Sequence, residues 1–370
     1  MEIFSSSMSF RSSSSMAVGA DGAGGGPRAT VPAMRVSLRG RQGGRRIDLV
    51  LGLLLATAVL TGTAANTIGV DWPLDLIQLH AAAALAILLL APWKYVVIRR
   101  GLRRTRRGRG KKALSLTLAA FVLITIGSGL LHSTGKVEFV GPLTLMQIHV
   151  GAAVGAVLAV AAHFFGHAVR PRRTDPDRRA LLRLGVLGAG AAVATAAWDT
   201  AATAGGRRFT GSIAKPSLEV TAWFNDAVPH LDPARWSLRV GSATFDLDAV
   251  RALPHERFTA VLDCTSGWYS SQDWDGVRLS ALLTAARAPA DGWRSLKVTS
   301  ATGYARWFGA DTLDDVWLVT AVGGRPLTFG HGFPARVVAP GRRGFWWVKW
   351  VTSIQPSARP PWAQSFFPLS

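Results

Sequence analysis

The sequence predicts a multi-domain protein, in which an all-α bundle of five transmembrane helices precedes a mixed α+β domain rich in β-structure. Five apolar stretches of bilayer-spanning length lie between residues 46 and 204. From residue 205 onward, short runs rich in β-branched and aromatic residues alternate with Gly, Pro, Asp and Asn, and one helix is expected over 278–286. Eleven of the 14 tryptophans fall in this second part, which indicates a globular domain with a large aromatic core.

The first 45 residues are rich in Ser, Gly and Arg and carry no apolar pattern. We therefore expect residues 1–45 to form a disordered tail, because such a composition cannot bury a core. The segment also lacks the apolar core of a cleavable signal peptide.

The five apolar stretches run roughly over 47–66, 75–98, 113–131, 143–168 and 180–198. The connection 99–112 has nine basic residues and 170–179 has five, whereas 66–75 has none and 132–141 has one. This alternation follows the positive-inside rule, so we expect a multi-pass protein of the cell membrane with a cytoplasmic N-terminus and an extracytoplasmic segment 205–370. A buried bundle in a soluble protein is the alternative.

The net charge of +20 could also suggest a protein that binds nucleic acid. The positive-inside rule already accounts for the basic residues, because they cluster at the ends of the predicted helices. We therefore expect no nucleic-acid partner.

Two histidines lie inside the predicted spans, His80 in the second and His149 in the fourth, at similar depth below the outer surface. Small residues surround both, which would let a flat macrocycle approach the backbone, and two facing imidazoles suit one bis-His haem b. The alternative is two separate histidines that hydrogen-bond to helix neighbours. His163 lies near the same face as His149, but its counterpart in the second span is Lys94, so a second haem stays open.

The four-helix arrangement, within a predicted domain 46–170, resembles membrane cytochrome b proteins over residues 75–168. The resemblance implies electron exchange with a quinone or quinol. In segment 171–204, Arg178 and Arg179 directly precede the fifth span, which has a Gly/Ala-rich core. It resembles a twin-arginine export signal, which implies the twin-arginine translocation machinery as a partner and export of a folded domain. Ordinary positive-inside charge is the alternative reading of this arginine pair.

Cys264 is the only cysteine in the chain, which excludes an internal disulfide and a CxxC metal site. It stands in "LDCTSGWYSSQDWDGVRLSALL" (262–283), and "HGFPARVVAPGRRGFWWVKWVTSI" follows at 331–354. Both stretches resemble the oxidoreductase molybdopterin-binding domain shared by sulfite oxidase and periplasmic protein-methionine-sulfoxide reductase, over about 215–358. The resemblance implies a sulfite-oxidase-like domain at 205–370 and molybdenum held by a pterin dithiolene and the Cys264 thiolate. A soft thiolate suits a redox metal.

The resemblance also implies roles for further residues. The residues expected to bind the cofactor are Asn225, Thr299, His331, Arg336, Trp347, Val348 and Lys349. Arg and Lys among them suit a phosphate group. Tyr304 and Arg306, or else Arg342 and Arg343, are candidates for substrate contacts, and Cys264, Tyr304 and Arg306 form the predicted catalytic set. The stretch after Cys264 has no basic residue before Arg278, unlike the Arg-rich sequence of sulfite oxidases, and is closer to the sulfoxide reductases.

Together these features predict a membrane-anchored, molybdopterin-dependent oxidoreductase that acts outside the cytoplasm on a small-molecule or protein-bound substrate. Oxygen-atom transfer, by S-oxide reduction or sulfite-type oxidation, is the expected reaction, with electrons exchanged with the quinone pool through haem b. Two alternatives remain at this point. One is a non-catalytic extracytoplasmic binding module on a membrane anchor, and the other is the same enzyme on a haem-free anchor.

Overall fold

The structure is a computed structural model that describes residues 41–67, 76–102, 108–167, 178–202, 207–208, 210–221, 227–288 and 292–364. The predicted tail lies outside the described residues up to residue 40, and so does Asn225.

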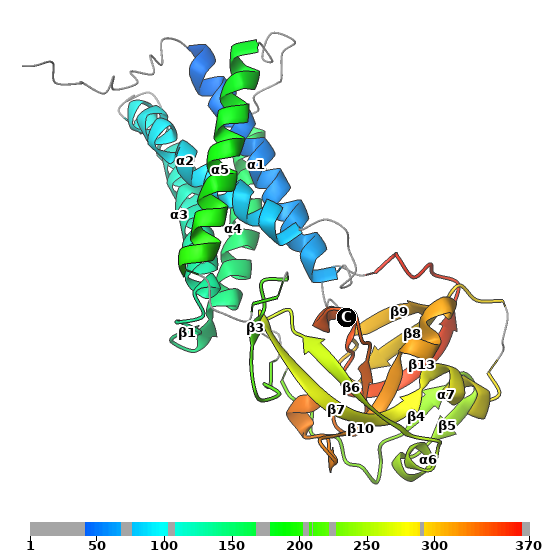
Figure 1. The fold of residues 1–370 in the computed structure, drawn as a ribbon. Helices are drawn as coiled ribbons and strands as arrows, with labels where there is room; N and C mark the ends of the chain where they lie inside the picture. The colour runs from blue at the N-terminus through cyan, green and yellow to red at the C-terminus, as the bar shows by residue number, and fades with distance from the viewer. Residues whose placement is uncertain are drawn as a thin grey trace, which may run out of the picture. The chain divides into compact units, whose positions relative to one another are not determined.

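Five long helices form the N-terminal part (Figure 1). They are α1 (Arg41–Thr67), α2 (Leu76–Leu102), α3 (Arg109–Ser133), α4 (Leu145–His167) and α5 (Arg178–Ala202). Each contains a segment of 19–24 residues that is long and apolar enough to cross a membrane. The five predicted helices are therefore confirmed. The α5 segment has the lowest mean hydropathy, 1.2, because Gly and Ala replace larger apolar residues there.

The helices pack as two antiparallel hairpins, α1 with α2 and α3 with α4, and α5 packs on α2. Small side chains such as Ala83, Ala86 and Ala152 are buried at these contacts. Large apolar side chains face outward instead, with Leu60 69% and Val186 72% exposed. An apolar exterior of this kind is what lipid-facing helices present. A short antiparallel pair, β1 (Phe139–Val140) and β2 (Leu143–Thr144), connects α3 to α4.

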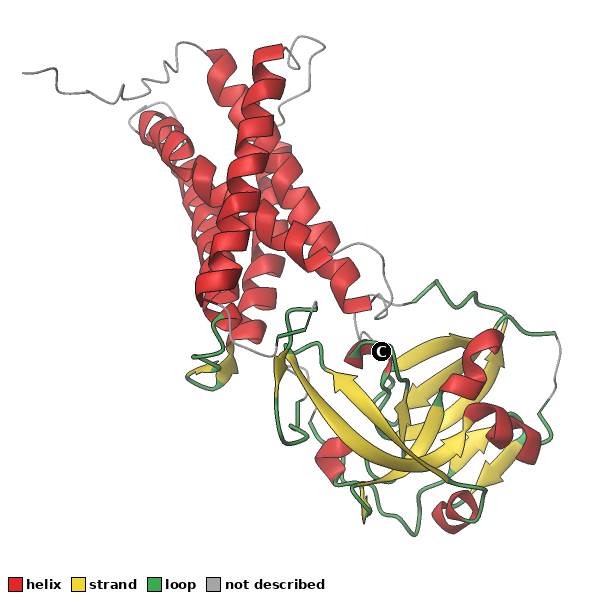
Figure 2. Ribbon diagram, viewed as in Figure 1, coloured by secondary structure: helices red, strands yellow, loops and turns green. Residues whose placement is uncertain are grey.

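The C-terminal part is built mainly of strands (Figure 2). The strands are β3 (Ile213–Ala214), β4 (Leu238–Val240), β5 (Ala243–Phe245), β6 (Glu256–Asp263), β7 (Trp268–Arg278), β8 (Ser295–Ser300), β9 (Ala305–Gly309), β10 (Trp317–Val322), β11 (Arg325–Pro326), β12 (Arg336–Val338) and β13 (Val351–Ser357). The helices are α6 (Leu247–Arg251), α7 (Leu279–Ala285) and the 3₁₀ turns η1 (Ala310–Asp315), η2 (Phe329–His331) and η3 (Gly344–Trp346).

These strands form two sheets. One has the order β11-β10-β7-β3, with β6 paired to β7 and β12 paired to β10. The other has the order β5-β4-β13-β8-β9. Pairing is antiparallel except between β3 and β7 and between β4 and β13. The predicted mixed, β-rich domain is confirmed.

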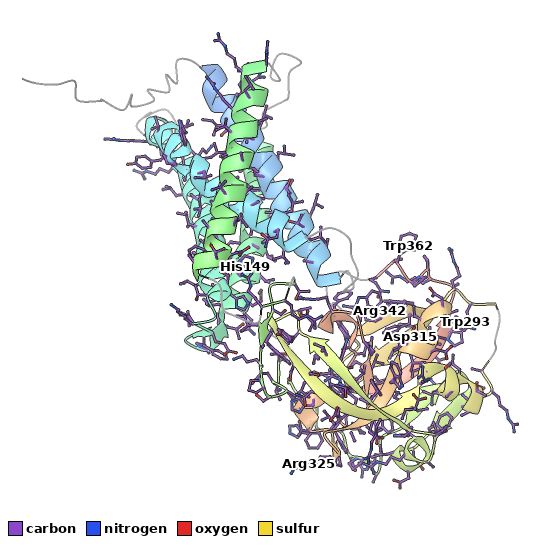
Figure 3. All side chains as sticks on the ribbon, viewed as in Figure 1. His149, Trp293, Asp315, Arg325, Arg342 and Trp362 are labelled. Carbon is purple, nitrogen blue, oxygen red and sulfur yellow. The ribbon has the colours of Figure 1, made fainter. Side chains whose placement is uncertain are left out.

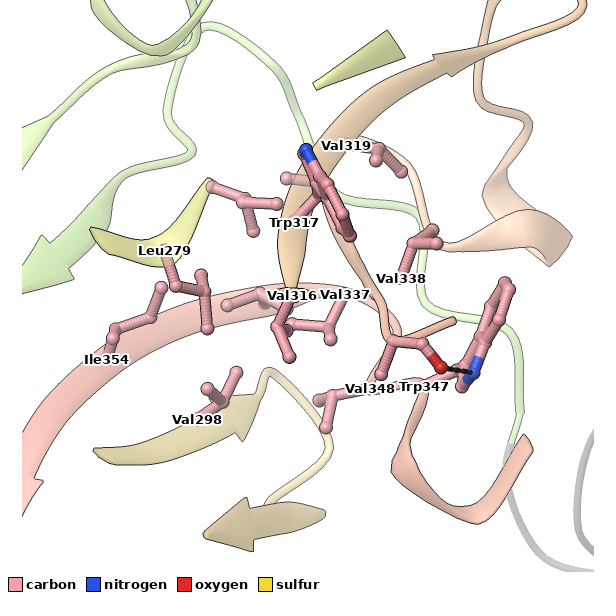
Figure 4. Packing of buried hydrophobic residues seen from close by; sticks show 14 of the residues in the cluster. Leu279, Val298, Val316, Trp317, Val319, Val337, Val338, Trp347, Val348 and Ile354 are labelled. Carbon is pink, nitrogen blue, oxygen red and sulfur yellow. Dashed lines mark hydrogen bonds between the residues drawn. The ribbon is translucent and has the colours of Figure 1, made fainter. Parts of the chain in front are cut away.

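One continuous core contains side chains from both sheets (Figure 4). Trp274, Leu318 and Ile354 are fully buried, and the Trp274 indole N–H donates to the Ala260 carbonyl at 3.2 Å. Strand alternation explains this: in β8 the buried Leu296 and Val298 alternate with the half-buried Lys297 and Thr299.

The predicted helix at 278–286 corresponds to α7 and is confirmed. The five-residue helix α6 escapes sequence prediction because it is too short to show a helical period. Its start is fixed by Asp246, whose carboxylate accepts a hydrogen bond from the Ala249 amide at 2.7 Å.

Candidate functional site

Cys264 begins the tight turn that joins β6 to β7. Its amide donates to the Trp268 carbonyl at 2.8 Å, and its own carbonyl accepts from the Gly267 amide at 3.0 Å. Gly267 has φ +89°, a conformation that favours glycine. The thiol is 8% exposed and lies 3.3 Å from the Thr221 hydroxyl and 3.5 Å from the Ser266 amide nitrogen. The turn therefore holds one buried sulfur at a fixed place among polar groups.

Arg336, on β12, is a buried cation near this sulfur. Its side chain is 2% exposed, and within the described part of the chain its Nε–H has no hydrogen-bond partner. The guanidinium lies 5.4 Å from the ring centroid of Trp274 and 5.6 Å from that of Trp347. Burial lowers the pKa of Arg336 to about 10, against the opposing effect of the Cys264 thiol group. The side chain stays charged at neutral pH, and an unused donor on a buried cation suits an anionic ligand.

His331 and Lys349 lie beside Arg336 because Gly332 closes the loop between them. Gly332 has φ +103°, and a Cβ there would lie 3.0 Å from the Cβ of Arg336 and 3.1 Å from that of Lys349. The His331 Nε2–H donates to the Leu218 carbonyl at 2.9 Å, and the Lys349 ammonium donates to the Thr221 carbonyl at 2.9 Å. Burial lowers the pKa of His331. The structure thus brings three of the predicted cofactor-binding side chains together with the segment that touches Cys264.

Trp347 and Val348 are placed by their backbone and packing contacts. The Trp347 indole N–H donates to the Ala339 carbonyl at 2.9 Å, and the Val348 carbonyl accepts from the Val337 amide at 2.7 Å. Their exposures are 3% and 0%. Both residues therefore fix the 339–348 turn against β12, and Figure 4 shows them among the buried residues of the core.

Tyr304 and Arg306 converge on one carbonyl of the same turn. The Tyr304 hydroxyl donates to the Phe345 carbonyl at 2.5 Å, and the Arg306 Nε–H donates to the same oxygen at 3.0 Å. Arg306 is 1% exposed, and burial lowers its pKa to about 10. The preceding residue, Gly344, lies against the Cys264 backbone, since a Cβ there would be 3.1 Å from the Cys264 Cα. Through η3, the pair is therefore linked to the turn at 264–267 that carries the thiol, called the thiol turn below.

Thr299 is half-buried on β8, opposite Ala305 in the neighbouring strand, next to the Val298–Arg306 pair. Asn225 lies outside the described residues, so the role expected for it stays a prediction.

The sequence analysis named Arg343 as a candidate for substrate contacts but missed the buried ion pair that it forms next to Cys264. Arg343 donates to the Asp263 carboxylate at 2.9 Å and to the Cys264 carbonyl at 3.3 Å. The hydroxyls of Ser212 and Thr210 donate to the same carboxylate at 2.6 and 2.7 Å. Arg343 is 4% exposed, and its hydrogen bond to the Cys264 carbonyl holds the thiol turn in place. The available signal was the acid directly before the lone cysteine.

Arg342, a substrate-contact candidate from the sequence, stacks on the indole of Trp346 at 4.5 Å from the ring centroid.

A second candidate site lies within the helices. The imidazoles of His80 on α2 and His149 on α4 have ring centroids 5.9 Å apart (Figure 3 labels His149). His80 Nδ1–H donates to the Ala58 carbonyl and His149 Nδ1–H to the Thr125 carbonyl, each at 2.8 Å. A carbonyl only accepts, so Nδ1 carries the proton and Nε2 carries the lone pair that a metal needs. A metal ion bound by both Nε2 atoms, with metal–nitrogen bonds of ~2 Å, would fit a ring separation of this size.

Comparison with known proteins addresses the C-terminal part. Residues 225–366 match the family model described as the oxidoreductase molybdopterin binding domain. The C-terminal part carries a molybdopterin-binding oxidoreductase domain. This molybdopterin domain is similar to mitochondrial sulfite oxidase from Drosophila melanogaster, 30% identical over 34% of this chain and 28% of that protein. The Homo sapiens sulfite oxidase is also 30% identical, over 35% of this chain and 31% of that protein.

The chain spans less than a third of the length of these curated relatives. Among solved structures, sulfane dehydrogenase SoxCD from Paracoccus pantotrophus matches with a TM-score of 0.34 and 26% identity. That match covers 36% of this chain and 40% of that one. The predicted enzyme class, a sulfite oxidase-like molybdopterin oxidoreductase domain, is confirmed by the family match.

Proposed function

We propose that the protein is a membrane-anchored molybdoenzyme whose molybdopterin domain works outside the cytoplasm. The observation that carries this proposal is the lone buried thiol of Cys264 close to Arg336 and Arg343. The Nε–H groups of both arginines have no hydrogen-bond partner within the described residues. Such a set fits a cofactor that combines a thiophilic metal with an anionic phosphate.

In this proposal the Cys264 thiolate holds the metal, and Arg336, His331 and Lys349 hold the pterin and its phosphate. When bound, the cofactor supplies two-electron redox chemistry coupled to oxygen-atom transfer. The protein supplies orientation and charge: Trp347 and Val348 hold the turn that carries the cofactor contacts, and Arg343 holds the backbone of the thiol turn. Tyr304 and Arg306 position the Phe345 carbonyl and are the candidates to orient a substrate. An S-oxide or a sulfite-type anion is the substrate class.

The helical part extends the proposal. His80 and His149 are proposed as the residues that would hold a haem b, since each presents Nε2 with Nδ1 held by a backbone carbonyl. A haem in this place supplies one-electron chemistry, which would connect the molybdopterin domain with quinone or quinol in the membrane.

The molybdenum assignment is tested with Cys264→Ser. We expect this variant to lose turnover with a panel of sulfite and S-oxides while keeping its fold, because Ser is nearly isosteric but is not a soft ligand. Metal analysis, pterin fluorescence and circular dichroism of the purified protein check this. Full turnover in the variant would remove Cys264 from the site. A wild-type protein without molybdenum would favour the non-catalytic binding module.

The haem assignment is tested with reduced-minus-oxidised absorption spectra of the purified protein. His80→Ala and His149→Ala are each expected to abolish the same low-spin signal, because six-coordinate iron needs both ligands. His163→Ala is the matched control and is expected to keep it. A wild-type protein with molybdenum but without this signal would identify the helices as a haem-free anchor.

A further inference from the structure

The helical part contains an internal repeat at the level of the sequence. The pattern P-L-x-L-x-Q-x-H occurs as "PLDLIQLH" (73–80) and again as "PLTLMQIH" (142–149), 69 residues later. A second match precedes each: Thr61-Gly62 in α1 corresponds to Ser128-Gly129 in α3, with a shift of 67 residues. The helix pair α1–α2 therefore corresponds to the pair α3–α4, the same division that the packing shows.

The backbone carbonyls that hold the two imidazoles occupy equivalent positions. The carbonyls that accept from His80 and His149 belong to Ala58 and Thr125, which are equivalent at the shift of 67, and both distances are 2.8 Å.

The adjacent hydroxyls repeat as well. The Thr61 hydroxyl donates to the Thr57 carbonyl and the Ser128 hydroxyl to the Ile124 carbonyl, both at 2.7 Å. Thr61 is 7% exposed and Ser128 is 6% exposed. Two unrelated histidines in helices would not be expected to have carbonyl, hydroxyl and glycine neighbours whose positions all differ by the same 67 residues.

A glycine completes each copy. A Cβ on Gly62 would lie 3.0 Å from the His80 Cε1 atom, and a Cβ on Gly129 would lie 3.0 Å from the His149 Cε1 atom. Each imidazole thus rests on the bare backbone of the preceding helix. By contrast, Gly52 in α1 and Gly127 in α3 have no atom within 4 Å of such a Cβ.

We infer that α1–α2 and α3–α4 are two copies of one helical hairpin, and that each copy builds half of a single haem site. This inference rests on the proposed haem function. It assigns Gly62 and Gly129 as positioning residues that set where each imidazole ring lies, with the equivalent hydroxyl residues Thr61 and Ser128 beside them. With Nδ1 held by a carbonyl, a ring whose Nε2 also bound iron would have no room to move away from a new methyl group.

The repeat also decides how many haems the hairpins hold. The position equivalent to His163 is Lys94, and the Lys94 ammonium donates to Asp48 at 2.5 Å. An ammonium has no lone pair for iron. The first copy therefore lacks the ligand that a second haem at His163 would need, and one haem per chain is expected.

The test compares four glycine variants of the full-length protein in detergent: Gly62→Ala and Gly129→Ala against the controls Gly52→Ala and Gly127→Ala. All four replace helical glycine with a better helix former, so helix propensity is matched within each helix. Haem is measured as pyridine haemochrome per chain and by haemin titration. A new methyl group that displaces the ring also disturbs the hydrogen bond from Nδ1 to the backbone carbonyl. Loss of such a contact to a metal-bound His costs roughly 10–100-fold in metal affinity, so Gly62→Ala and Gly129→Ala should weaken haem binding by about 10-fold or more. Both controls should keep one haem per chain.

Molybdenum content and helical circular dichroism report folding separately from haem binding. Thr61→Ser gives the first hairpin the residue that the second hairpin has at Ser128, so this variant is expected to retain haem. Three results would overturn the inference while leaving the haem itself in place: full haem affinity in Gly62→Ala, equal losses in the controls, or two haems per wild-type chain. Absence of haem from the wild type would instead overturn the proposed haem function.

Discussion

Asp263 and Arg343 form the buried ion pair that joins the thiol turn to the 339–348 turn. Both are nearly inaccessible, at 1% and 4% exposure, and the carboxylate accepts two further hydroxyl hydrogen bonds. Burial lowers the pKa of Arg343, and the neighbouring Asp263 opposes that effect. A buried pair of this kind contributes little by its mere presence, but removal of one partner leaves an uncompensated charge.

We therefore predict that Asp263→Asn destabilises the molybdopterin domain by about 3–5 kcal/mol. Asp248→Asn is the control, since Asp248 also pairs with an arginine, Arg251, but its side chain is 94% exposed. That variant is expected to unfold like the wild type because water screens the pair. Urea unfolding followed by tryptophan fluorescence measures both. Equal unfolding midpoints for the two variants would show that the Asp263 pair is not structurally important.

At the scale of elements, the loop from η2 to β12 depends on a glycine in the left-handed region. Gly332 has φ +103° and ends η2, where its missing Cβ leaves room for Arg336 and Lys349. A side chain at position 332 would destabilise the fold in two ways. It would strain the backbone, and it would overlap with two residues of the proposed cofactor site.

Comparison of Gly332→Ala with Gly292→Ala separates these costs. Gly292 has φ +88° but no atom within 4 Å of a Cβ, so its variant carries strain alone, roughly 1–3 kcal/mol. Gly332→Ala is expected to lower the unfolding temperature further and to lose pterin, because the overlap displaces Arg336 and Lys349. Thermal unfolding and pterin fluorescence check this. If Gly332→Ala behaves like Gly292→Ala in both measurements, the loop does not need the close approach.

At the scale of the whole molecule, the arginine pair at the start of α5 distinguishes two routes of membrane insertion. Arg178 and Arg179 are the first residues of α5, whose apolar segment is the least hydrophobic of the five. Positive-inside topology depends on charge, which Lys also supplies. Recognition of a guanidinium pair by an export receptor does not tolerate Lys.

On the hypothesis that the arginine pair is an export signal, the double variant Arg178→Lys/Arg179→Lys is expected to insert the first four helices normally and to leave residues 205–370 in the cytoplasm, because the folded domain would no longer be exported. Protease added to protoplasts, followed by detection of the C-terminal part, reports the side of the membrane. Cleavage of that part in the Lys-Lys variant, as in the wild type, would identify the arginines as ordinary topogenic charge.

The sequence by itself determined the five helices, the β-rich character of the second part and the identity of the molybdopterin domain. Helices long and apolar enough to cross a membrane can be predicted because length and apolarity are properties of one continuous segment. Cys264 and the His331–Lys349 stretch are readable because residue identity and spacing carry the family match. Only the tertiary structure decided that Arg343 binds the Cys264 carbonyl, 79 residues away, and that Tyr304 and Arg306 share the Phe345 carbonyl. It likewise decided that Gly62 and Gly129 lie against His80 and His149. Such contacts join segments distant in the chain, and packing of the whole fold, rather than any local preference, sets which atoms meet.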